Sequence, residues 1–502
     1  MDVAGGRRED IKALALAFFV AFSLRFMPEL QTPYPVGYDI PTYAVGAAHF
    51  LDNPLRILSG PLLMFAILSI FHSLGLELCF ALKFITPVLY GLMAVSFYVF
   101  LRVSLGWDVK KSLLCTILCI LQPTALRISW DLLKMEFGLT ALFLFMASFA
   151  HCERSNGRAL ALTSFLSLVV TLSHQLPTVL MFIFLAYKWW KERALGHMKM
   201  FFLTLLPFSF FMVHLLVFIG VIKTKPLIQF REVIWLKTLY DEKMVLSVCF
   251  PRNYLLERPF RSGGWVDVIL YVPLAFVMCF AFLLPLVPFG LRHYGFLDVL
   301  SYWLAFATFS VIACPWAYPF AHFFRWLLLM VFPLSIYATE GVFRLAERFG
   351  KRILALTIAL NTIIAVGYAN GLPYSNVSIP PPMTAYMPNR MTYSTIELYQ
   401  IDDCKVCILW LNEHVENNSV LVVEQRFFAW ALMWLDERIP IAVYKADVPL
   451  DDVELGDVLS AYEHVYILWY VGEAPSWENY ISSELFSSGD IAVYEFSRGS
   501  EL

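Results

Sequence analysis

Long apolar runs constrain this chain more than any other feature of its sequence. A helix needs roughly 17–25 apolar residues to cross a bilayer. Runs that approach this length lie at 11–27, 79–101, 112–127, 132–150, 159–173, 175–190, 200–221, 266–290, 296–313, 322–343 and 353–369. The 502-residue chain is 59% hydrophobic and only 15% charged, which excludes a soluble globule. We therefore expect a polytopic α-helical membrane protein with about eleven spanning helices.

Basic residues in the connecting loops predict how these helices are oriented, because loop Lys and Arg gather on the cytoplasmic side. If the further apolar run 58–75 does not cross, the basic loops fall on the side of the N-terminus: Arg7, Arg8 and Lys12; Arg102, Lys110 and Lys111; Arg154 and Arg158; Lys188, Lys191, Arg193 and Lys199; Arg344, Arg348, Lys351 and Arg352. The short loops on the opposite side, near 128–131, 174 and 315–321, are nearly free of Lys and Arg. We expect an N-terminus inside and a first outer loop over 28–78, whose apolar stretch lies on or dips into the membrane.

Two further segments are expected outside the membrane. The loop 222–264 holds eight Lys or Arg against four acids. After the transmembrane domain (1–370), a Pro-containing tether (371–395) leads to a soluble part (396–502) that is rich in acids. The β-rich runs SVLVVE, IPIAVY, HVYILWYV and DIAVYEF there alternate with helical or turn patterns. This pattern predicts a small C-terminal α/β outer domain.

Cys404 and Cys407 form a C-x-x-C pair in this soluble part. A structural zinc site of this kind normally draws on a second pair of ligands, and the sequence offers no such pair. A chance pair or a local disulfide fits the spacing better, and the sequence does not decide between these two.

Charged and polar side chains gather in one layer at the predicted outer face: Asp39, Lys83, Arg127, Asp131, Lys134, Glu136, His174, His322 and Arg325. Each charge at membrane depth costs about 2.5–3.5 kcal/mol on insertion scales, so such a layer calls for an explanation. Acids, several cations and a His on one face indicate a site for a phosphorylated, lipid-borne substrate. Tyr38, Tyr43 and the Pro and Gly residues around them would hold Asp39 at the mouth of a membrane cavity.

Single members of the layer also have structural explanations. These are helix capping for Asp39, contacts with lipid phosphates for Lys83 and Arg325, an i,i+3 ion pair for Asp131 and Lys134, and a turn hydrogen bond for His174.

The chemistry of sugar transfer from a lipid phosphate requires two things of such a layer. A carboxylate in a dry, enclosed setting has a raised proton affinity and can deprotonate an acceptor. Arg, Lys or a divalent cation such as Mg²⁺ or Mn²⁺ can stabilise the charge on the departing phosphate. The sequence leaves the need for such a cation open. It contains no Walker A or G-x-G-x-x-G loop, and no nucleic-acid partner is expected.

Several features occur together in this chain. They are a Tyr-Asp pair in a long first outer loop with an apolar helix, R-x-x-L-G-W followed by a basic loop, HFFRWLLLMVFPLSIYATEG late in the membrane part, and the outer α/β domain. In this combination the chain resembles the polytopic GT-C glycosyltransferases. That superfamily includes oligosaccharyltransferase catalytic subunits, protein O-mannosyltransferases and aminoarabinose transferases.

The resemblance implies a set of site residues. In the superfamily a catalytic or metal-binding acid lies in the first outer loop, which corresponds to Asp39, and a second outer acid corresponds to Asp131. The candidate substrate-binding residues come from the charged layer itself and its neighbours: Tyr38, Tyr43, Lys83, Arg127, His174, His322 and Arg325. The chain lacks both the Trp-Trp-Asp motif of oligosaccharyltransferases and the Asp-Glu pair of O-mannosyltransferases, since Ile40 follows Asp39. These departures argue against a peptide acceptor and leave metal dependence open.

The sequence thus predicts an enzyme of the cell membrane, a glycosyltransferase that takes a sugar from a polyprenyl-phosphate-linked donor. Its acceptor would be a glycan, lipid or protein at the outer face, where the C-terminal domain is also expected. Two alternatives stay open. A transporter or flippase of a lipid-linked substrate would favour inverted repeats and broken helices at the bilayer midplane. A non-catalytic membrane scaffold would bind partners through its acidic outer domain.

Overall fold

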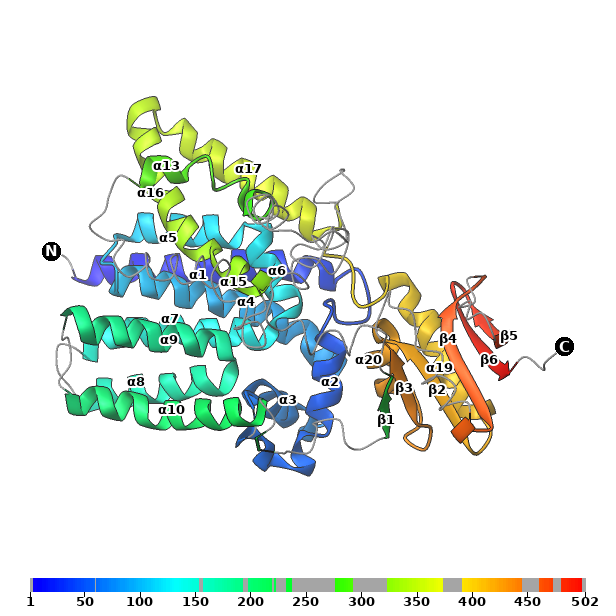
Figure 1. The fold of residues 1–502 in the computed structure, drawn as a ribbon. Coiled ribbons are helices and arrows are strands. Elements are labelled where there is room, and N and C mark those ends of the chain that lie inside the picture. Colours follow the sequence, from blue (N-terminus) through cyan, green and yellow to red (C-terminus); the bar gives the residue numbers. More distant parts are fainter. Residues whose placement is uncertain are drawn as a thin grey trace, which may run out of the picture.

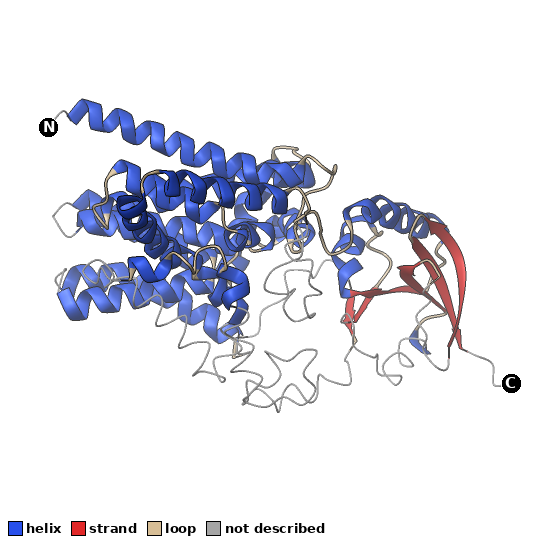
Figure 2. Cartoon of the chain, turned by 90° about the horizontal axis from the view of Figure 1, so that it is seen from above, coloured by secondary structure: helices blue, strands red, loops and turns tan. Residues whose placement is uncertain are grey.

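A bundle of long helices carries a mixed β-sheet at one end, and the N-terminus lies at the opposite end (Figures 1 and 2). The computed structural model describes residues 3–58, 60–152, 157–192, 197–218, 221–222, 232–236, 276–291, 323–372, 391–444, 460–472 and 480–498. The helices outside the sheet region are α1 (Val3–Glu29), α2 (Ile40–Ala48), α3 (Leu63–Ser73), α4 (Leu78–Val103), α5 (Val109–Ile120), α6 (Pro123–Asp131), α7 (Leu133–Cys152), α8 (Gly157–Ser173), α9 (Gln175–Tyr187), α10 (His197–Phe218), α13 (Val287–Gly290), α15 (Phe323–Leu329), α16 (Val331–Phe349) and α17 (Arg352–Ala369).

Five stretches of helix in the described part are long and apolar enough to cross a membrane. They are Arg8–Glu29, Leu78–Val103, Leu133–Ala150, Leu327–Phe349 and Arg352–Ala369. Each coincides with a run predicted to span, and the bent pair α5–α6 makes a sixth if it counts as one span. The total of about eleven stays a prediction, because much of 266–290 and all of 296–313 lie outside the described residues.

Helix α3 occupies the ambiguous apolar run 58–75. Its 11 residues rise about 16 Å at roughly 1.5 Å per residue. The hydrocarbon core of a bilayer is about 30 Å thick. The helix is therefore too short to span, as the charge pattern of the later loops requires; which face of the membrane it occupies stays a prediction.

A sharp bend of 64° separates α5 from α6. It falls at Pro123, in the first turn of α6. Proline is accommodated there because the first amides of a helix have no intrahelical partner, and it cannot continue the helix before it. The side-chain amide of Gln122 donates to Asn361 Oδ1 at 2.9 Å and so anchors the bend to α17. As a result, α6 does not continue along the axis of α5.

In the described part of the chain the sheet has six strands, in the order β1-β3-β2-β4-β6-β5. The strands are β1 (Val233–Trp235), β2 (Ser419–Glu424), β3 (Ile441–Tyr444), β4 (His464–Tyr470), β5 (Tyr480–Ser488) and β6 (Ile491–Arg498), and α19 (Ile401–His414) and α20 (Gln425–Trp434) belong to the same region. The pairs β1–β3, β2–β3 and β2–β4 are parallel, and the pairs β4–β6 and β5–β6 are antiparallel. All six residues of β2 are buried, as expected for a parallel strand covered on both faces.

Strand β1 comes from the loop predicted over 222–264, more than 180 residues before its neighbour β3 in the chain. Val233 pairs with Ile441 and Trp235 with Val443. The second outer loop therefore contributes an edge strand to the C-terminal sheet. The domain boundaries at 370 and 395 otherwise stay predictions, and residues 373–390 of the tether lie outside the described part.

Cys404 and Cys407 lie on α19, are buried and form no disulfide. Both belong to the apolar cluster that α19 and α20 build against one face of the sheet. Of the two readings that the sequence left open, the structure therefore contradicts the local disulfide, and the pair acts as small apolar core residues.

Helix α2 lies between the bundle and the sheet (Figure 1). Val45 of α2 joins the apolar cluster of α19 and α20, whereas Ile40 and Tyr43 pack in a second cluster with residues of α3 and α4. The residue just before α2 is Asp39. The acid singled out by the sequence thus sits where the two parts of the molecule meet.

Candidate functional site

A cavity of about 270 Å³ opens at the sheet end of the bundle. It is lined by Asp39, Tyr43, Leu132, Lys134, Met135, His174, Gln175, Leu176, Val179, Phe211, His214, Leu215 and Arg325. Four of the predicted site residues therefore line one space: Asp39, Tyr43, His174 and Arg325. They come from three separate segments of the chain: the start of α2, the N-cap of α9, and α15.

Asp39 occupies the N-cap position of α2, as the sequence suggested, but its side chain makes no capping hydrogen bond. Pro41 in the first turn removes one amide that such a cap would satisfy. Within the described residues, the structure shows no hydrogen bond or ion pair to this carboxylate. Capping thus does not account for the acid, and its carboxylate is available to the cavity.

The surroundings of Asp39 raise the pKa of its carboxyl group toward neutral pH. Burial raises the pKa of Asp39 to about 6, and the negative charge of Asp131 acts in the same direction. The positive charges of Arg325, Lys134 and Arg127 partly oppose this rise. A carboxylate with a pKa near 6 is largely ionised at neutral pH yet still a useful proton acceptor.

The backbone next to Asp39 leaves no room for a side chain. Gly37 has φ +147°, and a Cβ atom built on it would lie 1.8 Å from the carbonyl oxygen of Trp130. The hydroxyl of Ser394 donates to the Gly37 carbonyl at 3.1 Å. Helix α6 and the segment before α19 therefore hold the loop from both sides, two residues before the acid.

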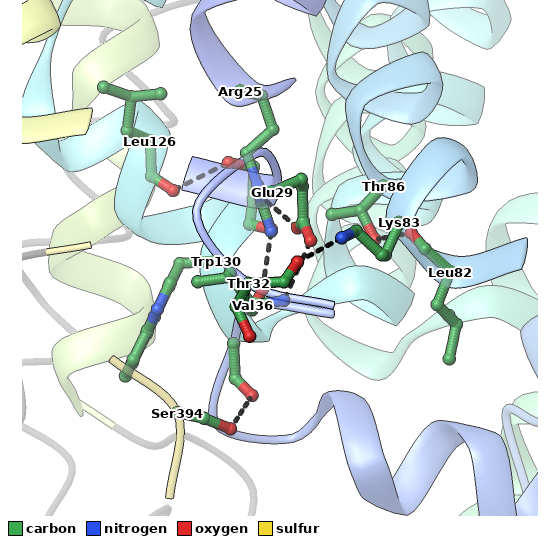
Figure 3. Close-up of polar contacts among 12 residues, drawn as sticks. Arg25, Glu29, Thr32, Val36, Leu82, Lys83, Thr86, Leu126, Trp130 and Ser394 are labelled. Atoms are coloured by element: carbon green, nitrogen blue, oxygen red, sulfur yellow. Dashed lines mark hydrogen bonds and ion pairs between the residues drawn. The ribbon is translucent and has the colours of Figure 1, made fainter. Parts of the chain in front are cut away.

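A buried ion pair holds the start of the same loop (Figure 3). Arg25 Nη1 lies 2.7 Å from Glu29 Oε1, and both side chains are almost completely buried. Arg25 also donates to the carbonyls of Val36 at 2.7 Å and Ser129 at 3.3 Å. Glu29 Oε2 accepts the Val36 amide at 3.0 Å. We call Arg25 and Glu29 the charge clamp; the sequence analysis overlooked both, because they end an otherwise apolar run.

Lys83, predicted as a phosphate partner, contributes to the same loop instead. Its ammonium group donates to the carbonyl of Thr32 (Figure 3). The residue is not part of the cavity lining. The structure thus gives Lys83 a role in holding the first loop, and nothing brings it to the other predicted site residues.

Arg127 and Asp131 form an ion pair with each other on α6. The Arg127 guanidinium also lies over the Trp130 ring, 5.0 Å from its centroid. The alternative that paired Asp131 with Lys134 is therefore wrong, because the i,i+4 partner on the same helix takes this carboxylate. Asp131 acts on Asp39 through its charge and does not line the cavity; its catalytic role stays a prediction.

Lys134 lines the cavity; the sequence analysis placed it in the charged layer but not among the substrate-binding residues. It is the second residue of α7. Its backbone amide donates to Tyr43 Oη at 3.3 Å, and its ammonium lies 5.4 Å from the centroid of the Phe65 ring. The structure shows no ion pair of Lys134 with a described residue. The spacing to Asp131 suggested neutralisation and so concealed this residue.

Two histidines, His174 and His214, also line the cavity. His174 is the N-cap of α9, and its Nδ1 accepts the Leu176 amide at 3.1 Å. His214 of α10 is only 4% exposed, and its Nε2 has no hydrogen-bond partner in the described part of the chain. The sequence analysis missed His214, although a His inside the apolar run 200–221 was a usable signal.

Of the two remaining predicted residues, Tyr38 does not line the cavity. Tyr38 packs beside Trp130, with ring centroids 6.5 Å apart. Burial, aided by the charge of Asp39, raises the pKa of Tyr38 to about 12, so its phenol stays protonated at neutral pH. His322 lies outside the described residues.

The fit of this site to a divalent cation can be judged from its donors. Asp39 is the only carboxylate among the described residues that line the cavity, and Lys134 and Arg325 line it as well. The described part of the chain holds no group of three or more His, Cys, Asp or Glu side chains that could bind a metal. Mg²⁺ and Ca²⁺ need six or more oxygen ligands, usually with more than one carboxylate. The donors described do not fit the predicted metal site at Asp39.

No protein-family model matches the sequence, and no curated protein matches it either. Solved structures do match. An oligosaccharyltransferase from Archaeoglobus fulgidus, tethered to an acceptor peptide with an NVT sequon, aligns over 98% of this chain and 74% of its own, with 11% identity and a TM-score of 0.56. Its apo form aligns over 92% and 70%, with 13% identity and a TM-score of 0.53. The arabinofuranosyltransferase AftD from Mycobacteria aligns over 97% of this chain at 14% identity, with a TM-score of 0.50.

The chain has the GT-C fold. The resemblance stated from the sequence is confirmed at this level. With its long apolar helices, the chain is a multi-pass membrane protein. It spans only 40% of the length of AftD, so activity, substrates and partners are matters for proposal.

Proposed function

We propose that the protein is a membrane glycosyltransferase. It transfers a sugar from a polyprenyl-phosphate-linked donor to a glycan, lipid or protein acceptor at the outer face of the membrane. Asp39 accepts the proton of the acceptor, and the cations of the cavity stabilise the phosphate. The GT-C fold supports this kind of chemistry, and the matched structures belong to an oligosaccharyltransferase and an arabinofuranosyltransferase.

The observation that carries the proposal is the environment of Asp39. Its carboxylate is unused in capping, its pKa is raised to about 6, and Lys134 and Arg325 line the same cavity. A base, two cations and an adjoining apolar bundle are the parts that transfer from a lipid phosphate requires.

The position of the cavity favours transfer over transport. Its charged residues lie near helix ends: Asp39 precedes α2, Lys134 is the second residue of α7 and Arg325 is the third of α15. Transporters instead place their polar sites near the bilayer midplane, between broken helices. A site at one end of the bundle suits a donor whose headgroup lies at the membrane surface.

The test is donor consumption in membranes that contain the wild-type chain or Asp39→Asn. Loss of polyprenyl-phospho-sugars would be followed by mass spectrometry and normalised to folded protein. A general base contributes about 10²–10⁴-fold, so the substitution should lower the rate by at least about 100-fold.

The matched control is Asp52→Asn in the same loop. The Asp52 side chain is 66% exposed and pairs only with His49 in the described structure. It should keep the wild-type rate. Full activity of Asp39→Asn, with the control also active, would overturn the proposed role of this acid.

A further inference from the structure

Two cations line the cavity at a place where metal-dependent enzymes would gather carboxylates. The lining has one acid, Asp39, against Lys134 and Arg325. The other nearby acid, Asp131, is already engaged by Arg127. Counting these three side chains alone, Asp39, Lys134 and Arg325, the lining carries one excess positive charge. That balance suits a ligand with a single negative charge, such as the phosphodiester of a lipid-phosphate-linked sugar.

Of the two cations, Lys134 carries the argument. Its backbone amide is held by a hydrogen bond, whereas its ammonium group forms no ion pair with a described residue. The hydrogen bond from its backbone N–H to Tyr43 Oη joins the start of α7 to α2, the helix that follows Asp39. The Phe65 ring lies against the ammonium on one side. No described carboxylate forms an ion pair with it. A compact ammonium with three donors is well suited to bind a phosphate as a point charge.

We propose that Lys134 takes the place of a divalent cation in this site. This inference rests on the proposed glycosyltransferase function and deepens it. The Lys134 ammonium binds the donor phosphate and offsets the charge that develops on it, with Arg325 beside it. Asp39 then serves as a proton acceptor and not as a metal ligand.

The step balances without any further reactant. The acceptor oxygen forms a bond to the anomeric carbon while the bond from that carbon to the phosphate oxygen breaks. The electron pair of the broken bond stays on the phosphate, which leaves as a polyprenyl phosphate with one more negative charge. The acceptor proton passes to Asp39. Lys134 therefore faces a charge that grows during the reaction, and stabilisation of that kind raises the rate.

The first arm of the test measures metal binding and needs no activity. Purified full-length protein in nanodiscs is titrated with Mn²⁺, and free Mn²⁺ is followed by electron paramagnetic resonance. The wild type should bind no Mn²⁺ with micromolar affinity. The variant Lys134→Glu, which places a second carboxylate beside Asp39, should gain binding. Stoichiometric micromolar binding to the wild type that is lost in Asp39→Asn would overturn the proposal, whatever the behaviour of Lys134→Glu.

The second arm measures binding of decaprenyl phosphate by thermal shift in detergent. The affinity of Lys134→Met should fall by at least about tenfold, whereas Lys134→Arg should keep most of it because the positive charge remains. The control is Lys110→Met, which removes an exposed cation of α5. Equal affinities of the wild type and Lys134→Met would contradict the inference alone. No binding to the wild type would contradict the proposed donor class as well.

Discussion

The charge clamp lies at the end of α1, and Asp39 of the cavity lies at the start of α2, only ten residues after Glu29. The charges at these two places have different partners. All three nitrogens of the Arg25 guanidinium and both oxygens of Glu29 are hydrogen-bonded. In the cavity, the structure shows no hydrogen bond to the Asp39 carboxylate and no ion pair of Lys134 within the described residues. Buried polar groups normally find partners inside the protein. Charges that lack them beside a cavity therefore point to a ligand, and charges that have them point to structure.

The largest effect is expected from opening the clamp. Arg25→Met leaves Glu29 buried without its ion-pair partner, and breaking a buried pair from one side costs about 3–5 kcal/mol. The unfolding free energy in detergent should fall by that amount. The double variant Arg25→Met/Glu29→Leu removes both charges and should recover part of the loss. If Arg25→Met unfolds like the wild type, the clamp does not hold the loop.

The second largest effect is expected from Gly37→Ala, because Gly37 lies in the loop that joins the charge clamp to Asp39. The new Cβ would collide with the Trp130 carbonyl, so α6 and the loop must separate. Unfavourable backbone conformations cost about 1–3 kcal/mol. Displacement of Asp39 should lower the transfer rate by about 10–100-fold as well.

A matched control for this substitution is Gly106→Ala. Gly106 also has a positive φ, of +67°, but nothing lies within 4 Å of its added Cβ. It should lose about 1–2 kcal/mol of stability from the backbone alone and keep its transfer rate per folded molecule. Equal loss of transfer in both variants would show that Gly37 has no special link to the site.

The pH dependence of transfer should report the acid of the cavity. The pKa of Asp39 is raised to about 6 by burial and by Asp131, and a base must be unprotonated to act. The value of kcat/KM should be level above pH 7 and fall about tenfold per unit below pH 6. A rate that stays level down to pH 4.5 would exclude Asp39 as the base.

The smallest effect is expected at Ser394, which does not line the cavity and contacts the loop two residues before Asp39. Ser394→Ala removes one hydrogen bond to the Gly37 carbonyl, and such a bond contributes about 0.5–1.5 kcal/mol. The midpoint of unfolding should shift by a few degrees, with transfer per folded molecule unchanged. A strong loss of transfer would mean that the segment before α19 takes part in the site directly.

Much of the fold could be predicted because it rests on local patterns. Long apolar runs became the described long helices, and SVLVVE became β2 because a strand buried on both faces is apolar throughout. Strand β1 could not be predicted in the same way. It has only three residues and pairs with β3, whose sequence lies far along the chain. Pairing of that kind depends on tertiary contacts and leaves no local signal.

The site was partly predictable for a related reason. Charge at membrane depth is costly, so Asp39, His174 and Arg325 stood out in the sequence, and the structure brings them to one cavity. Which charge pairs with which depends on side-chain direction. Asp131 has cations at both i−4 and i+3, and only the structure shows that Arg127 takes it and Lys134 turns to the cavity. For the same reason the sequence did not separate Lys83, which binds a backbone carbonyl, from the cations of the cavity.

The most direct test of the account measures stability and transfer side by side in Asp39→Asn. The raised pKa of Asp39 means that its charged form is disfavoured by folding, a cost present above about pH 6 and relieved as the pH falls through that value. At pH 7.5 the Asn variant should therefore unfold no more easily than the wild type while its transfer rate falls by at least about 100-fold. Wild-type transfer, or a clear loss of stability, would contradict the claim that this acid serves a substrate and not the fold.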